Sequence, residues 1–101
     1  MYREKIKLLQ IPYLVFIGNK PPADQYTPNT SVDHLYVELE PAEVEVLHLV
    51  DMLGHSREEA GEMMGVSRGT IWRLLQEARK KTAEALTEGR GIKIMSNKEE
   101  D

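Results

Sequence analysis

The sequence has no cysteine and few aromatic residues, with one tryptophan and one phenylalanine in 101 residues. The absence of cysteine excludes disulfides, thiolate metal sites, iron–sulfur clusters and a cysteine nucleophile. No apolar run approaches the roughly 20 residues that a membrane-spanning helix needs, and no signal-peptide core follows the charged start MYREKIK. We therefore expect one small, soluble, cytoplasmic domain without a membrane partner.

The sequence also lacks the arrangements that support catalysis or metal binding. His34, His48 and His55 share no ligand spacing with one another or with acidic residues. The glutamates at 58–62 belong to the first turn of a predicted helix, where carboxylates favour the helix dipole. There is no nucleophile–base pair and no phosphate-cradling glycine-rich loop. We expect no enzyme activity, no cofactor and no metal ion.

Charge is unevenly distributed along a chain whose net charge is −4. Residues 24–62 hold ten acidic side chains against Arg57 alone, whereas residues 66–93 hold seven basic side chains against three acidic ones. Binding of a polyanion depends on the local field of one face, so an acidic total does not exclude nucleic acid. Ordinary scatter of charge on solvated helices is the alternative interpretation.

The N-terminal part, residues 1–37, is predicted to be an arm with a short strand and a loop. The segment IPYLVFIG at 11–18 is rich in β-branched and aromatic residues, which is typical of a strand. The proline-rich segment 19–31 is predicted to be a loop. The segment HLYVELE at 34–40 alternates apolar and other residues, which fits a second short strand or an extended lead-in.

Residues 38–90 are predicted to form three helices. Pro41 suits the first position of a helix, and apolar periodicity continues over 42–53 until Gly54. A Ser-x-x-Glu capping box at Ser56 opens a second helix, which ends at Gly65. Ser67 caps a third helix that runs to Glu88, and its apolar side is predicted to consist of Ile71, Leu74, Leu75, Ala78, Thr82, Ala85 and Leu86.

The C-terminal residues 91–101 are predicted to be a short strand followed by a frayed acidic tail. The strands predicted at 12–17 and 92–95 are expected to pair, either within one chain or across a dimer. An unpaired edge on YLVFI in so small a chain favours covering by a second copy, so we expect a homodimer.

Two helices joined by a short turn that contains glycine are the geometry of a helix-turn-helix. Counted from Arg57, the fifth position must be small and is Gly61, and the ninth must tolerate positive φ and is Gly65. We expect Gly61→Leu to clash and Gly61→Ala to be tolerated or stabilising. The core positions of the motif are all apolar: Ala60, Met64, Val66, Ile71 and Leu74. The predicted fold class is mainly α, a three-helix helix-turn-helix domain with short N- and C-terminal strands.

In this motif the second helix of the pair enters the major groove of DNA. Its predicted outward side offers arginine for guanine, glutamine for adenine and threonine for a thymine methyl. Trp72 is expected either to contact sugar or a thymine methyl, or to be covered by the N-terminal strand or a partner subunit. Near the groove walls, phosphate contacts are expected from the start of the supporting helix and from later turns, where Arg79, Lys80 and Lys81 alternatively serve the helix itself. The candidate DNA-binding residues are Ser56, Arg57, Ser67, Arg68, Gly69, Thr70, Trp72, Arg73, Gln76, Arg79 and Lys80.

The stretch ELEPAEVEVLHLVDMLGHSREEAGEMMGVSRGTIWRLLQEARKKTAEALTEG resembles the region-four helix-turn-helix of sigma-70 family factors. It is more similar still to a family of small, uncharacterised, predicted DNA-binding proteins of bacteria and archaea, in which such a run precedes a short apolar ending such as GIKIM. The resemblance covers residues 38–95. It implies a sigma-70 region-four-like, winged-helix-like fold, DNA binding and transcriptional control. Members usually begin with a strongly basic, proline- and arginine-rich tail, whereas this chain begins with MYREKIK.

Two functions remain open from the sequence. The first is a sequence-specific regulator that binds double-stranded DNA through the helix at 67–88. The second is a protein-interaction module that docks on RNA polymerase or another regulator through an acidic first helix with Glu43, Glu45 and Asp51. The cations Arg68 and Arg73 favour the first function, and the net charge of −4 favours the second.

Overall fold

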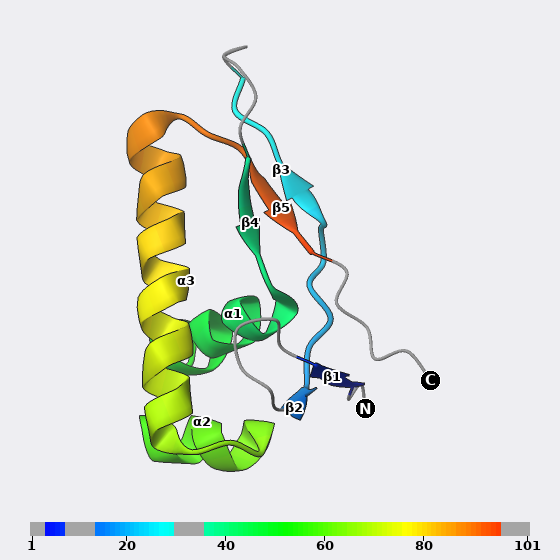
Figure 1. Cartoon of the computed structure of the whole chain (residues 1–101), viewed down its shortest axis with the longest axis vertical. Helices are drawn as coiled ribbons and strands as arrows, with labels where there is room; N and C mark the ends of the chain where they lie inside the picture. The colour runs from blue at the N-terminus through cyan, green and yellow to red at the C-terminus, as the bar shows by residue number, and fades with distance from the viewer. Residues whose placement is uncertain (1–3, 8–13, 30–35, 96–101) are drawn as a thin grey trace.

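The computed structural model of the chain describes residues 4–7, 14–29 and 36–95. Three helical segments and a small mixed sheet make up most of it, with a separate two-stranded hairpin near the N-terminus (Figure 1). In the described part of the chain, no helix has both the length and the apolar character to cross a membrane. The elements in chain order are β1 (Glu4–Lys7), β2 (Leu14–Ile17), β3 (Gln25–Tyr26), β4 (Val37–Leu39), α1 (Pro41–Val46), η1 (Leu47–Met52), α2 (Arg57–Met64), α3 (Arg68–Glu88) and β5 (Ile92–Ile94).

The first helix begins at Pro41 and ends before Gly54, as the sequence predicts, but its second half is wider than an α-helix. From Leu47 to Met52 the backbone is a π-helix, and the Leu53 N–H donates to the His48 carbonyl five residues back at 2.9 Å. Gly54 then has φ of 82°. The apolar periodicity that predicted this helix does not distinguish α from π geometry, because both bury one stripe.

Both predicted caps of the next two helices are confirmed. The Glu59 N–H donates to the Ser56 hydroxyl at 3.0 Å, and the Ser56 N–H donates to the Glu59 carboxylate at 2.9 Å. This second bond is the largest reason that the pKa of Glu59 lies below its ordinary value. At the start of α3 the Thr70 N–H donates to the Ser67 hydroxyl at 3.1 Å. The capping box and the second cap therefore fix where α2 and α3 begin.

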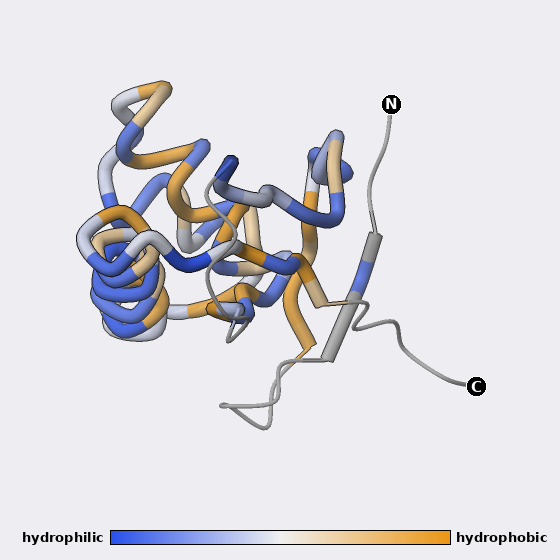
Figure 2. Tube along the Cα trace, turned by 90° about the horizontal axis from the view of Figure 1, so that it is seen from above, coloured by the Kyte–Doolittle hydropathy of each residue, from blue (hydrophilic) through white to orange (hydrophobic). Residues whose placement is uncertain are grey.

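The core lies between the three helical segments and β2. Each fully buried large aliphatic side chain contributes about 1.5–3 kcal/mol relative to exposure. In Figure 2, where α3 is viewed nearly end-on, hydrophilic residues make up most of its turns, so α3 gives only a narrow stripe to this core. The prediction was wrong at Leu86, which is 78% exposed, whereas the neighbouring Ala85 is buried. The core residues are Val15, Ile17, Ala42, Val46, Leu49, Ala60, Met64, Ile71, Leu74, Leu75 and Ala78.

The strand pairing differs from the prediction. β2 pairs antiparallel with β1, with Lys5 opposite Phe16, and not with the C-terminal strand. β5 is instead the middle of a three-stranded sheet, antiparallel to β3 and parallel to β4. The predicted loop at 19–31 therefore contributes a short strand. Residues 12–13 of the predicted first strand and the predicted tail at 96–101 lie outside the described residues.

The two sheets lie at opposite ends of the molecule. Figure 1 shows the three-stranded sheet beside the C-terminal half of α3, while the β1–β2 hairpin lies at the end where α2 meets α3. The expected unpaired edge of YLVFI is wrong for one side of β2, since β1 covers that edge along its described length.

Candidate nucleic-acid interface

The three residues Gly65–Ser67 join α2 to α3. Gly65 has φ of 74°, as the motif predicts, and the Val66 N–H donates to the Gly61 carbonyl at 2.9 Å. A Cβ atom on Gly61 would lie 2.6 Å from the Val66 carbonyl oxygen, which belongs to the backbone. The need for a small residue at Gly61 is therefore confirmed, and the contact argues against the expectation that alanine is tolerated or stabilising, because even one methyl group must push the turn away.

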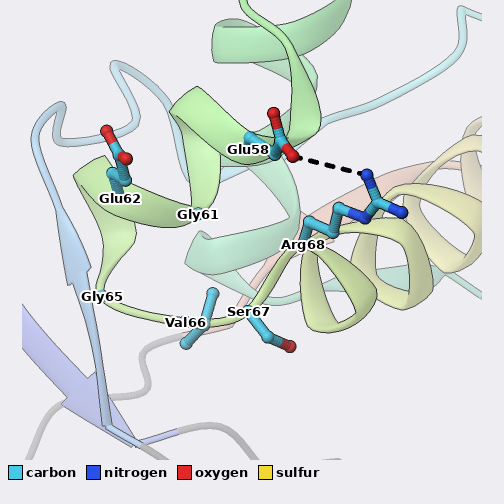
Figure 3. A pocket seen from close by; sticks show the side chains of 7 residues that line it. All are labelled: Glu58, Gly61, Glu62, Gly65, Val66, Ser67 and Arg68. Carbon is cyan, nitrogen blue, oxygen red and sulfur yellow. Dashed lines mark hydrogen bonds and ion pairs between the residues drawn. The ribbon is translucent and has the colours of Figure 1, made fainter.

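An open hollow of about 790 Å³ lies between α2 and the start of α3. Figure 3 shows Glu58 and Glu62 on its α2 wall and Arg68 opposite, with the turn residues between them. Arg68 Nη1 lies 3.4 Å from a Glu58 carboxylate oxygen, and both side chains are mostly exposed. Such an exposed pair contributes little and exchanges readily. Sequence reasoning missed Glu58 and Glu62 as part of this surface, although their four-residue spacing placed them on one helix face.

The first turn of α3 contains residues that were predicted to contact DNA bases. One of them, Thr70, does not face outward as predicted. Thr70 is only 7% exposed, and its hydroxyl lies 3.1 Å from the Ser67 hydroxyl. It serves the cap rather than an outward face. Gly69 is exposed, and a Cβ there would meet only the Ser67 hydroxyl at 3.8 Å. A side chain at position 69 would therefore meet no close contact from the described residues.

Arg57 and Trp72, from different helices, lie against each other. The Arg57 guanidinium lies 4.7 Å from the centroid of the Trp72 rings, within the range of a cation–π interaction. Trp72 remains 43% exposed, so no described strand covers it. This stacking fixes a long cationic side chain at the start of α2 beside the exposed side of α3.

Arg73, Gln76 and Lys80 continue the exposed side of α3 beyond Trp72. No hydrogen bond or ion pair joins them to any residue in the described ranges, so their polar groups point to solvent. Ser56 is also exposed, although its hydroxyl already caps α2.

Arg79 is held by an acidic partner instead of facing solvent freely. Its Nε and Nη2 atoms donate to the two Asp51 carboxylate oxygens at 3.1 Å and 2.7 Å, which ties α3 to η1. These hydrogen bonds lower the pKa of Asp51 and raise the pKa of Arg79. The prediction that Arg79 flanks a DNA backbone therefore competes with an existing bidentate ion pair.

The Asp51–Arg79 pair predicts a pH-dependent stability term. The folded-state pKa of Asp51 lies below its ordinary value of 3.8, so the contribution is complete above pH 3.8 and is lost as pH falls through the folded-state value. Asp51→Asn should lower the free energy of unfolding by less than about 1 kcal/mol at neutral pH, because both side chains are partly exposed. Urea unfolding at stepped pH measures this difference, which should disappear in acid. Asp24→Asn, at an exposed aspartate, is the control; a difference that persists at the lowest pH would contradict the assignment.

The acidic first helix does not offer the docking surface that the sequence suggested. Glu43 is fully buried and receives the Lys81 ammonium on both carboxylate oxygens, at 3.0 and 3.1 Å. Glu45 is also buried, and one of its oxygens accepts from the Gly18 N–H at 3.0 Å. The expected surface was wrong because these acids bind parts of their own chain. In the described ranges, no three histidine, aspartate or glutamate side chains converge on a possible metal site.

The chain belongs to the protein family described as "Protein of unknown function DUF134", whose pattern matches residues 10–100. It is 40% identical over 80 residues to a UPF0251 protein of Archaeoglobus fulgidus, covering 79% of this chain and 76% of the relative. A UPF0251 protein of Shewanella baltica is 38% identical over 82 residues, covering 79% of this chain and 84% of the relative.

A shorter stretch is more strongly preserved. A UPF0251 protein of Pyrococcus furiosus is 60% identical over 53 residues, which make up 52% of this chain and 49% of that relative. The chain thus spans about half the length of the Pyrococcus and Thermococcus relatives that it matches. No solved structure matches the chain.

Proposed function

We propose that this DUF134 member is a sequence-specific double-stranded DNA-binding protein that acts in transcriptional control. In this proposal α2 and α3 form a helix-turn-helix of the sigma-70 region-four type, and α3 enters the major groove. The observation that carries it is the exposed side of α3, where Gly69, Trp72, Arg73 and Gln76 lie in succession beyond a tight glycine turn.

The positions of the residues around α3 support separate roles in contacting bases and in contacting phosphates. At about 100° per residue, Gly69, Arg73 and Gln76 lie within about 60° of one another around the helix. These residues would face base edges, with arginine suited to guanine and glutamine to adenine. Arg57, stacked on Trp72 at the edge of this face, would bind a phosphate beside the N-terminus of α2.

Docking on RNA polymerase or another regulator is the alternative function. The acidic first helix no longer supports this alternative as a docking surface, because its Glu43 and Glu45 are buried. It retains Glu58 and Glu62, which line the hollow between α2 and α3. A salt titration partly distinguishes DNA binding from protein docking, because binding through phosphates weakens steeply as the salt concentration rises.

Selection of bound sites from a random duplex pool, followed by titration, tests the proposed function. Trp72 is the only tryptophan of the chain, so its fluorescence reports directly on the proposed contact surface. We also propose that the protein binds as a homodimer, because one helix-turn-helix makes few base contacts. Selected sites with two inverted halves about 10 base pairs apart would support that arrangement. If no sequence is enriched and no duplex changes the fluorescence at low salt, the DNA-binding proposal is wrong.

Replacing Arg73 and replacing Arg68 are expected to change DNA binding in different ways. Arg73→Ala should weaken binding to the selected site by about 1–3 kcal/mol and relax the preference at one base position. Arg68→Ala should weaken all sequences alike and reduce the salt slope by about one unit, provided that Arg68 exchanges Glu58 for a phosphate. Binding selections and salt titrations on both variants measure these effects. Glu58→Gln is the matched control, since it frees Arg68 and should not weaken binding.

A further inference from the structure

The β1–β2 hairpin touches the turn between α2 and α3. Val15 and Ile17 of β2 are buried in the core, so by the alternation of a strand Leu14 and Phe16 face the other side. The Phe16 ring presses on Gly65, because a Cβ atom built there would lie 3.1 Å from a ring carbon. The hairpin is therefore fixed against the residue that sets the direction of α3.

A cation lies on the same face of the hairpin. Lys5 is directly opposite Phe16 in the strand register, and side chains opposite each other share one face of the sheet. The Lys5 ammonium lies 5.8 Å from the Phe16 ring centroid, and Lys5 is exposed. It forms no ion pair with a residue of the described ranges. The contacts from Gly65 through Phe16 to Lys5 thus place a cation, without an ion pair to any described residue, on the hairpin that packs against the α2–α3 turn.

The hairpin and Arg57 lie on opposite sides of the exposed face of α3. Leu14 lines a hollow of about 330 Å³ together with Gly65–Ser67 and Thr70, so the hairpin lies on the Thr70 side. Arg57 lies on the Trp72 side. Thr70 and Trp72 are two residues apart, which is about 200° around a helix by the buried side and about 160° by the exposed side, and Arg73 falls in the exposed arc.

A helix in the major groove has one DNA backbone on each side, across a groove about 12 Å wide. From this geometry we propose that the β1–β2 hairpin is a second DNA-contacting element. Lys5 binds a phosphate on the strand opposite to the one that Arg57 contacts. This inference rests on the proposed function, and it adds an element that neither α2 nor α3 supplies.

The chain offers a matched control for Lys5. Lys93 is also an exposed strand lysine, with its ammonium 4.8 Å from the Tyr36 ring centroid, but it lies in the three-stranded sheet beside the far half of α3 (Figure 1). Lys5→Gln and Lys93→Gln therefore remove the same charge and the same kind of ring contact. Lys5→Arg retains the charge at the hairpin.

The experiment measures the affinity of these variants for the selected duplex by fluorescence anisotropy between low and high salt. Lys5→Gln should reduce the salt slope by about 0.9 and weaken binding roughly fivefold to tenfold near 0.1 M salt, with little effect near 1 M. Lys93→Gln and Lys5→Arg should bind as wild type does. Single neutral methylphosphonates then locate the contact. One position should weaken wild type but not Lys5→Gln, and it should lie on the strand opposite to the position that becomes silent in Arg57→Gln.

Each other outcome is decisive. If wild type binds the duplex and Lys5→Gln has an unchanged salt slope, the hairpin is not a DNA contact, while the proposed function stands. If Lys5→Gln alters the sedimentation of the free protein, the hairpin is a contact between subunits and the inference is wrong. If wild type binds no duplex, the proposed function and this inference fail together. Circular dichroism of each variant confirms that the fold is retained in these comparisons.

Discussion

Lys81→Met is expected to lower the free energy of unfolding by about 3 kcal/mol. The Glu43 carboxylate is fully buried, and the Lys81 ammonium donates to both of its oxygens. Methionine keeps the length and apolar stem of lysine but removes the charge, so a buried carboxylate loses its cation. The Lys81 side chain is 22% exposed, so water replaces part of the lost interaction and the effect lies at the lower end for a broken buried pair.

The neighbouring residue provides the control for this prediction. Lys80 is exposed and has no hydrogen bond or ion pair within the described ranges, so Lys80→Met should change stability by less than about 0.5 kcal/mol. Adding Glu43→Gln to Lys81→Met should restore most of the loss, because the amide oxygen still accepts from the Glu40 N–H, which now donates to Glu43 Oε1 at 2.9 Å. Urea unfolding followed by circular dichroism measures all three variants. Equal losses for Lys80→Met and Lys81→Met would show that the buried pair contributes nothing special.

This prediction also bears on function. The run Arg79–Lys81 looks like a basic patch in the sequence, yet Arg79 binds Asp51 and Lys81 binds Glu43. Of the three cations, Lys80 has no ion partner among the described residues. Two of the five basic residues of α3, Arg79 and Lys81, are thus paired with acidic residues of α1 and η1. The charges counted in the sequence therefore overestimate both an acidic docking surface on the first helix and a long basic DNA-binding surface on α3.

The sequence predicted the elements that depend on local chemistry. Caps at Ser56 and Ser67 and the positive φ of Gly65 follow from hydrogen-bonding and steric rules within a few residues, and the structure has all three. The exposed positions of Arg73 and Gln76 followed from helical period in the same way.

Partners that are distant along the chain were not predictable. Nothing local to Phe16 indicates that its ring lies on Gly65, or that β5 pairs with β3 and β4 instead of β2. Thr70 was assigned by its spacing to the side of α3 that faces DNA, but it is buried and its hydroxyl lies against the Ser67 hydroxyl. The helical period determines the angle of a side chain around its helix, whereas the burial of that side chain depends on which segment packs at that angle.

Gly61→Leu is expected to prevent stable folding, and Gly61→Ala to cost about 1–2 kcal/mol of stability. In a free helix alanine would gain about 1 kcal/mol over glycine. Here its Cβ atom would lie 2.6 Å from the Val66 carbonyl oxygen, and the Arg68 and Ser67 backbones lie at 3.5 Å. All three neighbours are backbone, so relief requires the turn to move away from α2 and not a side chain to rotate.

Gly69→Ala separates this contact from helix propensity. Gly69 is also a helical glycine, but a Cβ atom there meets only the Ser67 hydroxyl at 3.8 Å, so the variant should be as stable as wild type or gain up to about 1 kcal/mol. Thermal and urea unfolding should therefore place Gly61→Ala below wild type in stability and Gly69→Ala at or above it. If both are stabilised to the same extent, the turn yields at no cost and the close crossing is not a constraint.

The same pair of variants connects the turn to the proposed reading of DNA. Opening the turn in Gly61→Ala moves the start of α3 relative to α2, so the phosphate contact of Arg57 and the base contact of Arg73 would no longer fit one duplex together. At a temperature where Gly61→Ala is fully folded, its affinity for the selected site should fall more than its affinity for random duplex. Gly69→Ala leaves the turn in place but adds a methyl group on the side of α3 that is proposed to face the bases. A fall in affinity with Gly69→Ala alone would place DNA against α3 and show that the angle between α2 and α3 tolerates adjustment.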